Sequence, residues 1–151
     1  MPESYVASTY LALNIHIVFA TKGRAPMIAD AWRNDLHAYI GGTIRGLGAT
    51  PTIVGGVADH VHLLVGLRGT HAVGDLIREV KKASNAWAKE RFVGFGWQEG
   101  YGAFSVSPGD LDRTIAYIAG QEEHHRRVSS ADELRAIMAE HRIEFDERFF
   151  E

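Results

Sequence analysis

Residues 60–67, with the sequence HVHLLVGL, constrain the fold of this chain more than any other segment. The residues at positions 61, 63, 65 and 67 are all apolar, and this period of two is typical of a β-strand with one face in a core. His60 and His62 fall on the other face, so the strand places two imidazoles side by side. A strand of this kind needs a sheet whose apolar face is covered by helices.

The periodicity of the remaining segments predicts the other elements of that sheet. Asp30 is a plausible N-cap for the first helix, and the run Ser107-Pro108-Gly109-Asp110 is typical of a helix start. Strands are predicted at 13–19, 50–57, 60–67 and 102–107, and helices at about 30–47, 71–91, 110–127 and 130–141. The order β-α-β-β-α-β is that of an α+β, ferredoxin-like (RRM-like) fold. We therefore expect an antiparallel sheet with helices on one face, the histidines on its open face, and further helices at the C-terminus.

The length and composition narrow the class of protein. We expect residues 1–151 to form a single domain. The chain has no cysteine, which excludes disulfides and thiolate metal ligands. It contains neither a signal-peptide pattern nor an apolar run of about 18 residues, so we predict no membrane span and a cytoplasmic location.

The net charge of -3 argues against a generally basic surface for nucleic acid. The acidity is concentrated in residues 121–151, which carry five basic and nine acidic residues, whereas residues 1–120 carry 11 and 10. Any DNA-binding surface must therefore be a local patch.

The two histidines are candidate ligands for a divalent metal ion. Imidazoles two residues apart in a strand share one face and can bind the same cation. A His-x-His strand also occurs without any metal, so the pair leaves both interpretations open. Leu64 stands where a histidine-triad hydrolase would have a third histidine, which argues against that class.

The predicted helix 110–127 carries a second candidate pair. Tyr117 and Gln121 are four residues apart and share one helix face, so a nucleophile and a neutral oxygen ligand would lie together. The same spacing fits an ordinary amphipathic helix with Ile115 and Ile118 in the core. Gly120 lies between the pair and is expected to loosen the helix locally.

In combination, these segments resemble the small single-tyrosine HUH transposases of bacterial insertion sequences, which include the IS200-like and REP-associated tyrosine transposases. The resemblance extends over nearly the whole chain and rests on NIHIVFATKGR (14–24), GGVADHVHLLV (55–65), WQEGYGAFSVS (97–107), YIAGQEEHH (117–125) and EFDERFF (144–150).

The resemblance implies a role for each matching position. Tyr117 would be the nucleophile, and His60, His62 and Gln121 would be the ligands of a divalent ion, Mg²⁺ or Mn²⁺. It further implies that the protein cleaves and rejoins single-stranded DNA with hairpin ends through a 5′-phosphotyrosine intermediate. It also implies a homodimer, in which the tyrosine helix packs against either the same chain's histidines or the partner's.

Basic residues near these motifs are candidate DNA contacts. The predicted set is Lys22, Arg24, Lys81, Lys82, Ser84 and Lys89. Interleaved acidic residues also fit an ordinary solvated helix face, and Trp87 and Trp97 fit either base stacking or core packing.

Three further histidines lie close to the predicted site. His16 is expected near the metal because the first and third strands are neighbours in this topology, but we do not predict it as a ligand. For His124 and His125 we favour a helix-capping role over a role in the site.

Two other functions fit parts of the same pattern. A metal-dependent phosphodiesterase would use His60 and His62 with water as the nucleophile, and would not need Tyr117. A DNA-binding relative without catalytic activity would not need the candidate nucleophile and metal ligands to be intact. These are His60, His62, Tyr117 and Gln121.

Overall fold

The computed structural model describes residues 9–145. The C-terminal motif at 144–150 therefore lies mostly outside the described residues. The main elements are β1 (Leu13–Ala20), α1 (Asp30–Gly46), β2 (Thr50–Gly56), β3 (His60–Leu67), α2 (Val73–Lys89), β4 (Gly102–Val106), α3 (Leu111–Ala119), α4 (Gln121–His124) and α5 (Ser130–Glu140). Two 3₁₀ turns, η2 (Lys22–Arg24) and η3 (Pro108–Asp110), precede α1 and α3. The predicted order of elements is confirmed.

The four strands form one antiparallel sheet in the order β2-β3-β1-β4. This is the ferredoxin-like arrangement, because the two central strands, β1 and β3, are the first strands of two successive β-α-β units. Ala20 of β1 is the register partner of His60, and Val18 is the partner of His62. The histidine pair therefore lies on a central strand near the end of the sheet where β1 leads into η2.

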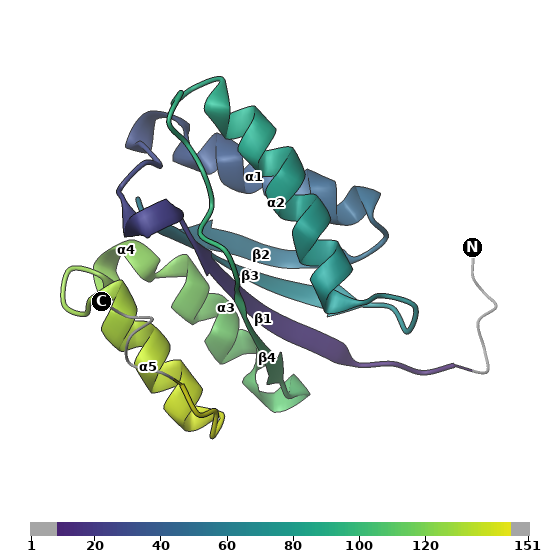
Figure 1. Ribbon diagram of the computed structural model, residues 1–151. Helices are drawn as coiled ribbons and strands as arrows, with labels where there is room; N and C mark the ends of the chain where they lie inside the picture. The colour runs from purple at the N-terminus through teal and green to yellow at the C-terminus, as the bar shows by residue number, and fades with distance from the viewer. Residues whose placement is uncertain (1–8, 146–151) are drawn as a thin grey trace.

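Helices α1 and α2 cover one face of the sheet, above it in Figure 1. Val61, Leu63 and Val65 of β3 point into this layer and belong to the main hydrophobic core. Apolar side chains of the two helices, Ile40 and Val80 among them, complete it. The alternation along β3 thus has the predicted physical cause, since burial of one face fixes the side on which the histidines lie.

The opposite face of the sheet is also covered, which the sequence did not predict. Helices α3, α4 and α5 lie across it, below the sheet in Figure 1. His60 and His62 are consequently buried between two layers and do not lie on an open surface. The expectation of an open face is wrong because the C-terminal helices fold back over it.

Several element boundaries differ from the prediction in ways that matter for the site. The expected helix at 110–127 is broken at Gly120, whose backbone leaves helical geometry between α3 and α4. Asp30 is the first residue of α1, not its N-cap. Ser129 caps α5 through its hydroxyl, which accepts a hydrogen bond from the Asp132 amide at 3.2 Å. No helix in the described part of the chain is long and apolar enough to span a membrane.

Candidate active site and nucleic-acid groove

His60 and His62 are held in fixed orientations by partners on their far ring nitrogens. Nδ1 of His60 lies 2.7 Å from Oδ1 of Asp59, in the turn before β3. Nδ1 of His62 lies 2.8 Å from Nε2 of His16, on the neighbouring strand. Both Nε2 atoms are thus left to face the C-terminal helices, and such partners typically orient metal-binding histidines.

Gln121 joins the histidines at the start of α4. Its side-chain oxygen lies 3.2 Å from Nε2 of His60. Gly55 on β2 makes this approach possible, because a Cβ there would stand 2.7 Å from the carbonyl oxygen of Ile118. The three predicted ligands, His60, His62 and Gln121, are therefore brought together within a single chain.

Tyr117 projects from α3 toward the same point. Its ring packs edge-on against His62, with centroids 5.6 Å apart. Its hydroxyl donates a hydrogen bond to the carboxylate of Glu133. Burial and this carboxylate both raise the pKa of Tyr117 well above its usual value of about 10, so the phenol is protonated in this state.

Glu133 of α5 is the central residue that the sequence did not predict. Its Oε1 lies 3.0 Å from Nε2 of His62 and 3.3 Å from Nε2 of His60, and its Oε2 accepts from the Gln121 amide at 3.0 Å. One signal was present in the sequence. Glu133 lies one helical turn before Ile137 and beside Leu134, and therefore borders the half-buried apolar side of α5.

His125 also reaches this cluster. Its Nε2 lies 3.1 Å from Oε2 of Glu133, and His124 approaches the same oxygen at 3.3 Å. The preference for a purely capping role is therefore wrong for these two residues. His60, His62, His125 and Glu133 each offer a ligand atom, and these four atoms lie within 4.8 Å of one another.

The cluster is electrostatically coupled. Burial would lower the pKa of His60, but hydrogen bonds with Asp59 and Glu133 outweigh it and raise that pKa to about 9. Burial lowers the pKa of His62 despite Glu133, and it lowers that of His16 to about 3. Burial disfavours the charged form of Glu133 as well, yet its bonds with both histidines hold its pKa well below the usual range.

The donor chemistry of this cluster fits a divalent cation. A buried carboxylate and a carboxamide oxygen suit Mg²⁺ and Mn²⁺, and imidazole is a common ligand of transition metals. Without a cation, the carboxylate of Glu133 is balanced by the protonated imidazole of His60. A divalent ion would take the place of that proton, because an imidazole binds metal in its neutral form.

The sequence between residues 9 and 121 matches the model of the family described as "Transposase IS200 like". The chain belongs to this family. The match includes both histidines of β3 and the pair Tyr117 and Gln121, but it ends before α5 and thus before Glu133.

Two solved structures of transposases share the fold of this family member. One is described as a candidate transposase from Deinococcus radiodurans R1, with 23% identity and a TM-score of 0.63, and the match covers 80% of this chain and 98% of the other. The second is a REP-associated tyrosine transposase bound to a REP hairpin, with 16% identity, a TM-score of 0.62, and coverage of 83% and 76%. A search of curated proteins found no match.

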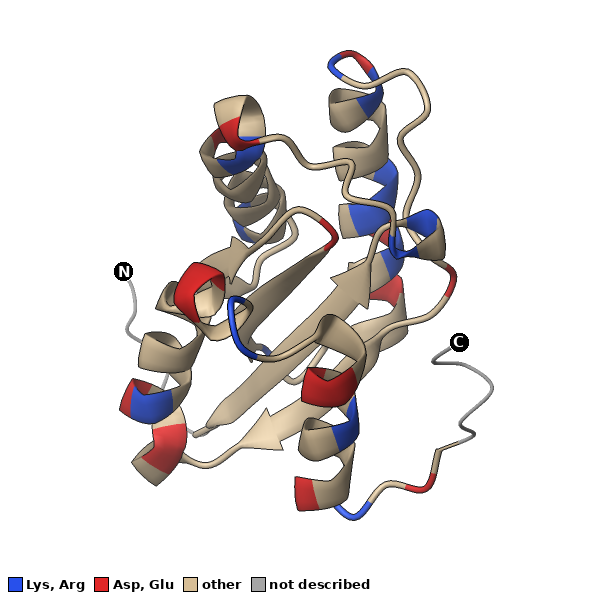
Figure 2. Ribbon diagram, turned by 90° about the vertical axis from the view of Figure 1, so that its left-hand side faces the viewer, with Lys and Arg blue, Asp and Glu red and all other residues tan. Residues whose placement is uncertain are grey.

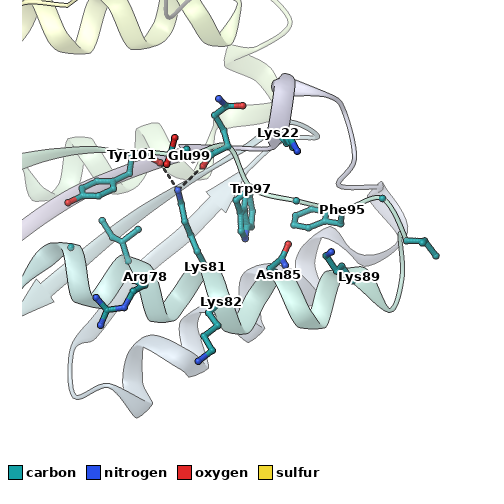
Figure 3. Close-up of a pocket in the computed structure, with 17 residues that line it drawn as sticks. Lys22, Arg78, Lys81, Lys82, Asn85, Lys89, Phe95, Trp97, Glu99 and Tyr101 are labelled. Carbon is teal, nitrogen blue, oxygen red and sulfur yellow. Dashed lines mark hydrogen bonds between the residues drawn. The ribbon is translucent and has the colours of Figure 1, made fainter.

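All four lysines of the chain line one groove. The groove runs between α2 and residues 93–101, with a volume of about 760 Å³ (Figure 3). Lys22, Lys81, Lys82 and Lys89, all predicted DNA contacts, are brought together there with Arg78. Among the described residues that line this lysine groove, Glu99 is the single carboxylate, so the groove is basic although the chain is acidic.

Two of the predicted DNA contacts lie elsewhere. Arg24 lines a separate cavity beside His60, where it donates to the hydroxyl of Ser130 at 3.4 Å. Ser84 is fully buried, donates to the Val80 carbonyl and accepts from the Trp97 indole at 3.0 Å, so its hydroxyl cannot contact DNA. The sequence contained a signal for this burial. Ser84 lies four residues after the apolar Val80 and therefore shares its helix face.

The two tryptophans considered for base stacking, Trp87 and Trp97, have different environments. Trp97 lines the lysine groove and also packs edge-on against Phe19, with ring centroids 4.7 Å apart. Trp87 stacks with Tyr39 and carries the Arg91 guanidinium 3.4 Å from its ring centroid. Only Trp97 therefore lies where it could contribute to a nucleic-acid groove.

Proposed function

We propose that this protein is a metal-dependent single-stranded DNA transposase that uses Tyr117 as its nucleophile. The observation that carries the proposal is that the candidate nucleophile and the candidate metal ligands meet at one place. Tyr117, the His60–His62 pair and Gln121 come from three elements and meet at one buried point, the Glu133 carboxylate. A structural role alone does not require a tyrosine hydroxyl to face a pair of candidate metal ligands.

The metal would be Mg²⁺ or Mn²⁺, held by His60, His62 and Gln121, with Glu133 supplying the negative charge. When bound there, the ion would polarise the scissile phosphate and stabilise the charge that develops in the transition state. Asp59 and His16 orient the two imidazoles toward this position.

The chemistry assigned to Tyr117 balances without an external energy source. Its phenolic oxygen attacks phosphorus, the bond from phosphorus to the 3′ oxygen breaks, and a 5′-phosphotyrosine and a free 3′-hydroxyl remain. The phenol proton has the carboxylate of Glu133 as its hydrogen-bond acceptor. Because the phosphodiester energy is conserved in the covalent link, attack by another 3′-hydroxyl can rejoin strands without ATP.

The nucleic-acid partner in this proposal is single-stranded DNA with hairpin ends. A transposase of similar fold has been solved bound to a REP hairpin, and the lysine groove offers this chain a matching basic surface. The proposed protein is a homodimer and is located in the cytoplasm. The candidate ligands and Tyr117 come from one chain, so a dimer is not needed to complete the site.

The decisive experiment is a covalent-adduct assay. Single-stranded DNA with imperfect-palindrome ends is incubated with the protein and Mg²⁺ or Mn²⁺, and then run on a denaturing gel. We expect an adduct with wild-type protein and with Tyr39→Phe, a control tyrosine on α1 outside the site. Tyr117→Phe is expected to bind DNA but form no adduct, and His60→Ala to lose cleavage while remaining folded.

The same assay separates the two alternative functions. Undiminished DNA cleavage by Tyr117→Phe would identify a phosphodiesterase that uses water and would overturn the tyrosine mechanism. Binding without cleavage by the wild-type protein, with either metal, would identify a relative that recognises DNA without cutting it.

A further inference from the structure

The lysine groove and the cavity beside His60 share a wall. The four residues Gln98, Glu99, Gly100 and Tyr101 line both of them. We refer to residues 98–101 as the crest. Because the crest separates the two hollows and borders each, a flexible chain that lies in the groove can reach the candidate active site by crossing it.

The crest lies close to the metal-site histidines. The amide of Gln98 donates to the carbonyl of Ala20 at 2.7 Å, and Ala20 is the register partner of His60 on β3. The step from Gln98 to Ala20 and the step from Ala20 to His60 each span the distance between adjacent strands. The backbones of Gln98 and His60 are therefore about 10 Å apart. At the helical rise of 3.4 Å per nucleotide this corresponds to about three nucleotides, and to fewer if the strand is stretched.

The crest is held in place before any ligand binds. The ammonium group of Lys81 donates to the carbonyls of Gln98 and Gly100, at 2.8 and 2.6 Å (Figure 3). The side-chain oxygen of Gln98 accepts from the Gly23 amide at 2.8 Å. A loop tied down at both of these points offers a fixed path, which lowers the entropy lost on binding.

The chemistry on the two sides of the crest differs. The groove carries five cationic side chains and, among the residues described, one carboxylate, which suits a phosphate backbone. The cavity beside His60 has a volume of about 500 Å³, and its wall combines the apolar side chains of Leu134 and Met138 with the carboxylates of Glu133 and Glu144. Tyr101 stands between them with 47% of its surface exposed, as a base-stacking platform requires.

We propose that the crest is the route by which a DNA strand passes from the lysine groove to the candidate metal site, where His60 and Glu133 line the cavity on its far side. Its phosphates lie in the groove, one base stacks on Tyr101, and the base next to the scissile phosphate enters the cavity beside His60. This inference rests on the proposed function, since it takes single-stranded DNA as the ligand. It adds the path of the strand, from the groove over the crest to the cavity beside His60. It also adds a short, fixed distance between the groove and the scissile phosphate.

The test is photocrosslinking from three positions along the route. In a Tyr117→Phe background, p-benzoylphenylalanine replaces Lys82 in the groove, Tyr101 on the crest or Met138 in the cavity, one at a time. The probe is a DNA hairpin with single-stranded flanks of random sequence. Replacement of Tyr39, an aromatic residue of similar exposure on α1, is the matched control.

We expect the three positions to crosslink to successive nucleotides of one strand, in the order 82, 101, 138, and position 39 to crosslink weakly. Tyr101→Ala is expected to weaken binding of the probe about fivefold or more. A different order, or crosslinks from position 82 but not from position 101, would overturn the route. These readouts need no cleavage, so absence of the Tyr117 adduct would refute the proposed function separately.

Discussion

Glu133 shows how a single side chain can join elements that are distant in sequence. Its carboxylate contacts the imidazole of His62 from β3, the hydroxyl of Tyr117 from α3 and the amide of Gln121 from α4. A buried carboxylate is stable only when it is paired, and here the pairing is supplied by the candidate nucleophile and the candidate metal ligands. The state of Glu133 therefore affects both the metal site and the protonation of Tyr117.

Replacement of Glu133 by glutamine is expected to weaken Mn²⁺ binding by about tenfold or more, or about 1.4 kcal/mol. The amide keeps the shape of the side chain but removes the anionic oxygen that two imidazoles and Gln121 cannot supply. Free Mn²⁺ can be measured by electron paramagnetic resonance during a titration. Glu140→Gln, an exposed position on the same helix, is the control and should bind as the wild type does. Equal affinities for both variants would show that Glu133 is not a ligand.

The sequence could predict those site residues that lie close to their partner along the chain. His60 and His62 lie two apart on β3, so strand geometry fixes their common face. Tyr117 and Gln121 lie four apart, and they stay close together although the helix breaks between them at Gly120. Glu133 reaches His62 across 71 positions, and its place beside the apolar residues of α5 does not indicate which residue it meets. Contacts of this kind depend on how helices pack, which periodicity does not specify.

At the scale of elements, the site depends on how closely α3 approaches β2. Gly55 is the point of contact, because a Cβ at this position would stand 2.7 Å from the Ile118 carbonyl oxygen and 2.9 Å from Ile118 Cγ2. Ile118 follows Tyr117 directly and precedes Gln121 by three residues. The break at Gly120 then turns Gln121 toward His60. The sequence indicated a weak point at Gly120, but not that the helix ends there.

Gly55→Ala is expected to destabilise the fold by about 1–3 kcal/mol and to weaken Mn²⁺ binding. The added methyl group pushes α3 away from β2 and carries Tyr117 and Gln121 with it. Urea unfolding and Mn²⁺ titration measure the two effects. In Gly42→Ala, on the exposed side of α1, the new Cβ meets nothing within 4 Å, so this control should gain about 0.5–1 kcal/mol. An unchanged metal affinity in Gly55→Ala would show that α3 does not position the ligands.

At the scale of the whole molecule, basic residues gather on α2, whereas the acidic excess of the chain lies in residues 121–151. Figure 2 shows basic segments along α2, at the upper right, and acidic segments mixed with basic ones on the C-terminal helices. A chain of net charge -3 repels a polyanion at long range, so binding must depend on contacts within the lysine groove. The strength of those contacts should therefore appear in the salt dependence of binding.

Lys82→Gln combined with Lys89→Gln is expected to weaken binding of single-stranded DNA and to reduce the slope of log K against log salt by about 1.4. Each lysine that neutralises a phosphate displaces counterions, and two such contacts are removed. Fluorescence anisotropy over a salt series measures the slope. Arg45→Gln combined with Arg68→Gln makes the same change in net charge at exposed positions outside the groove. If both double variants change the slope equally, DNA responds to the overall charge, and the groove is not its binding surface.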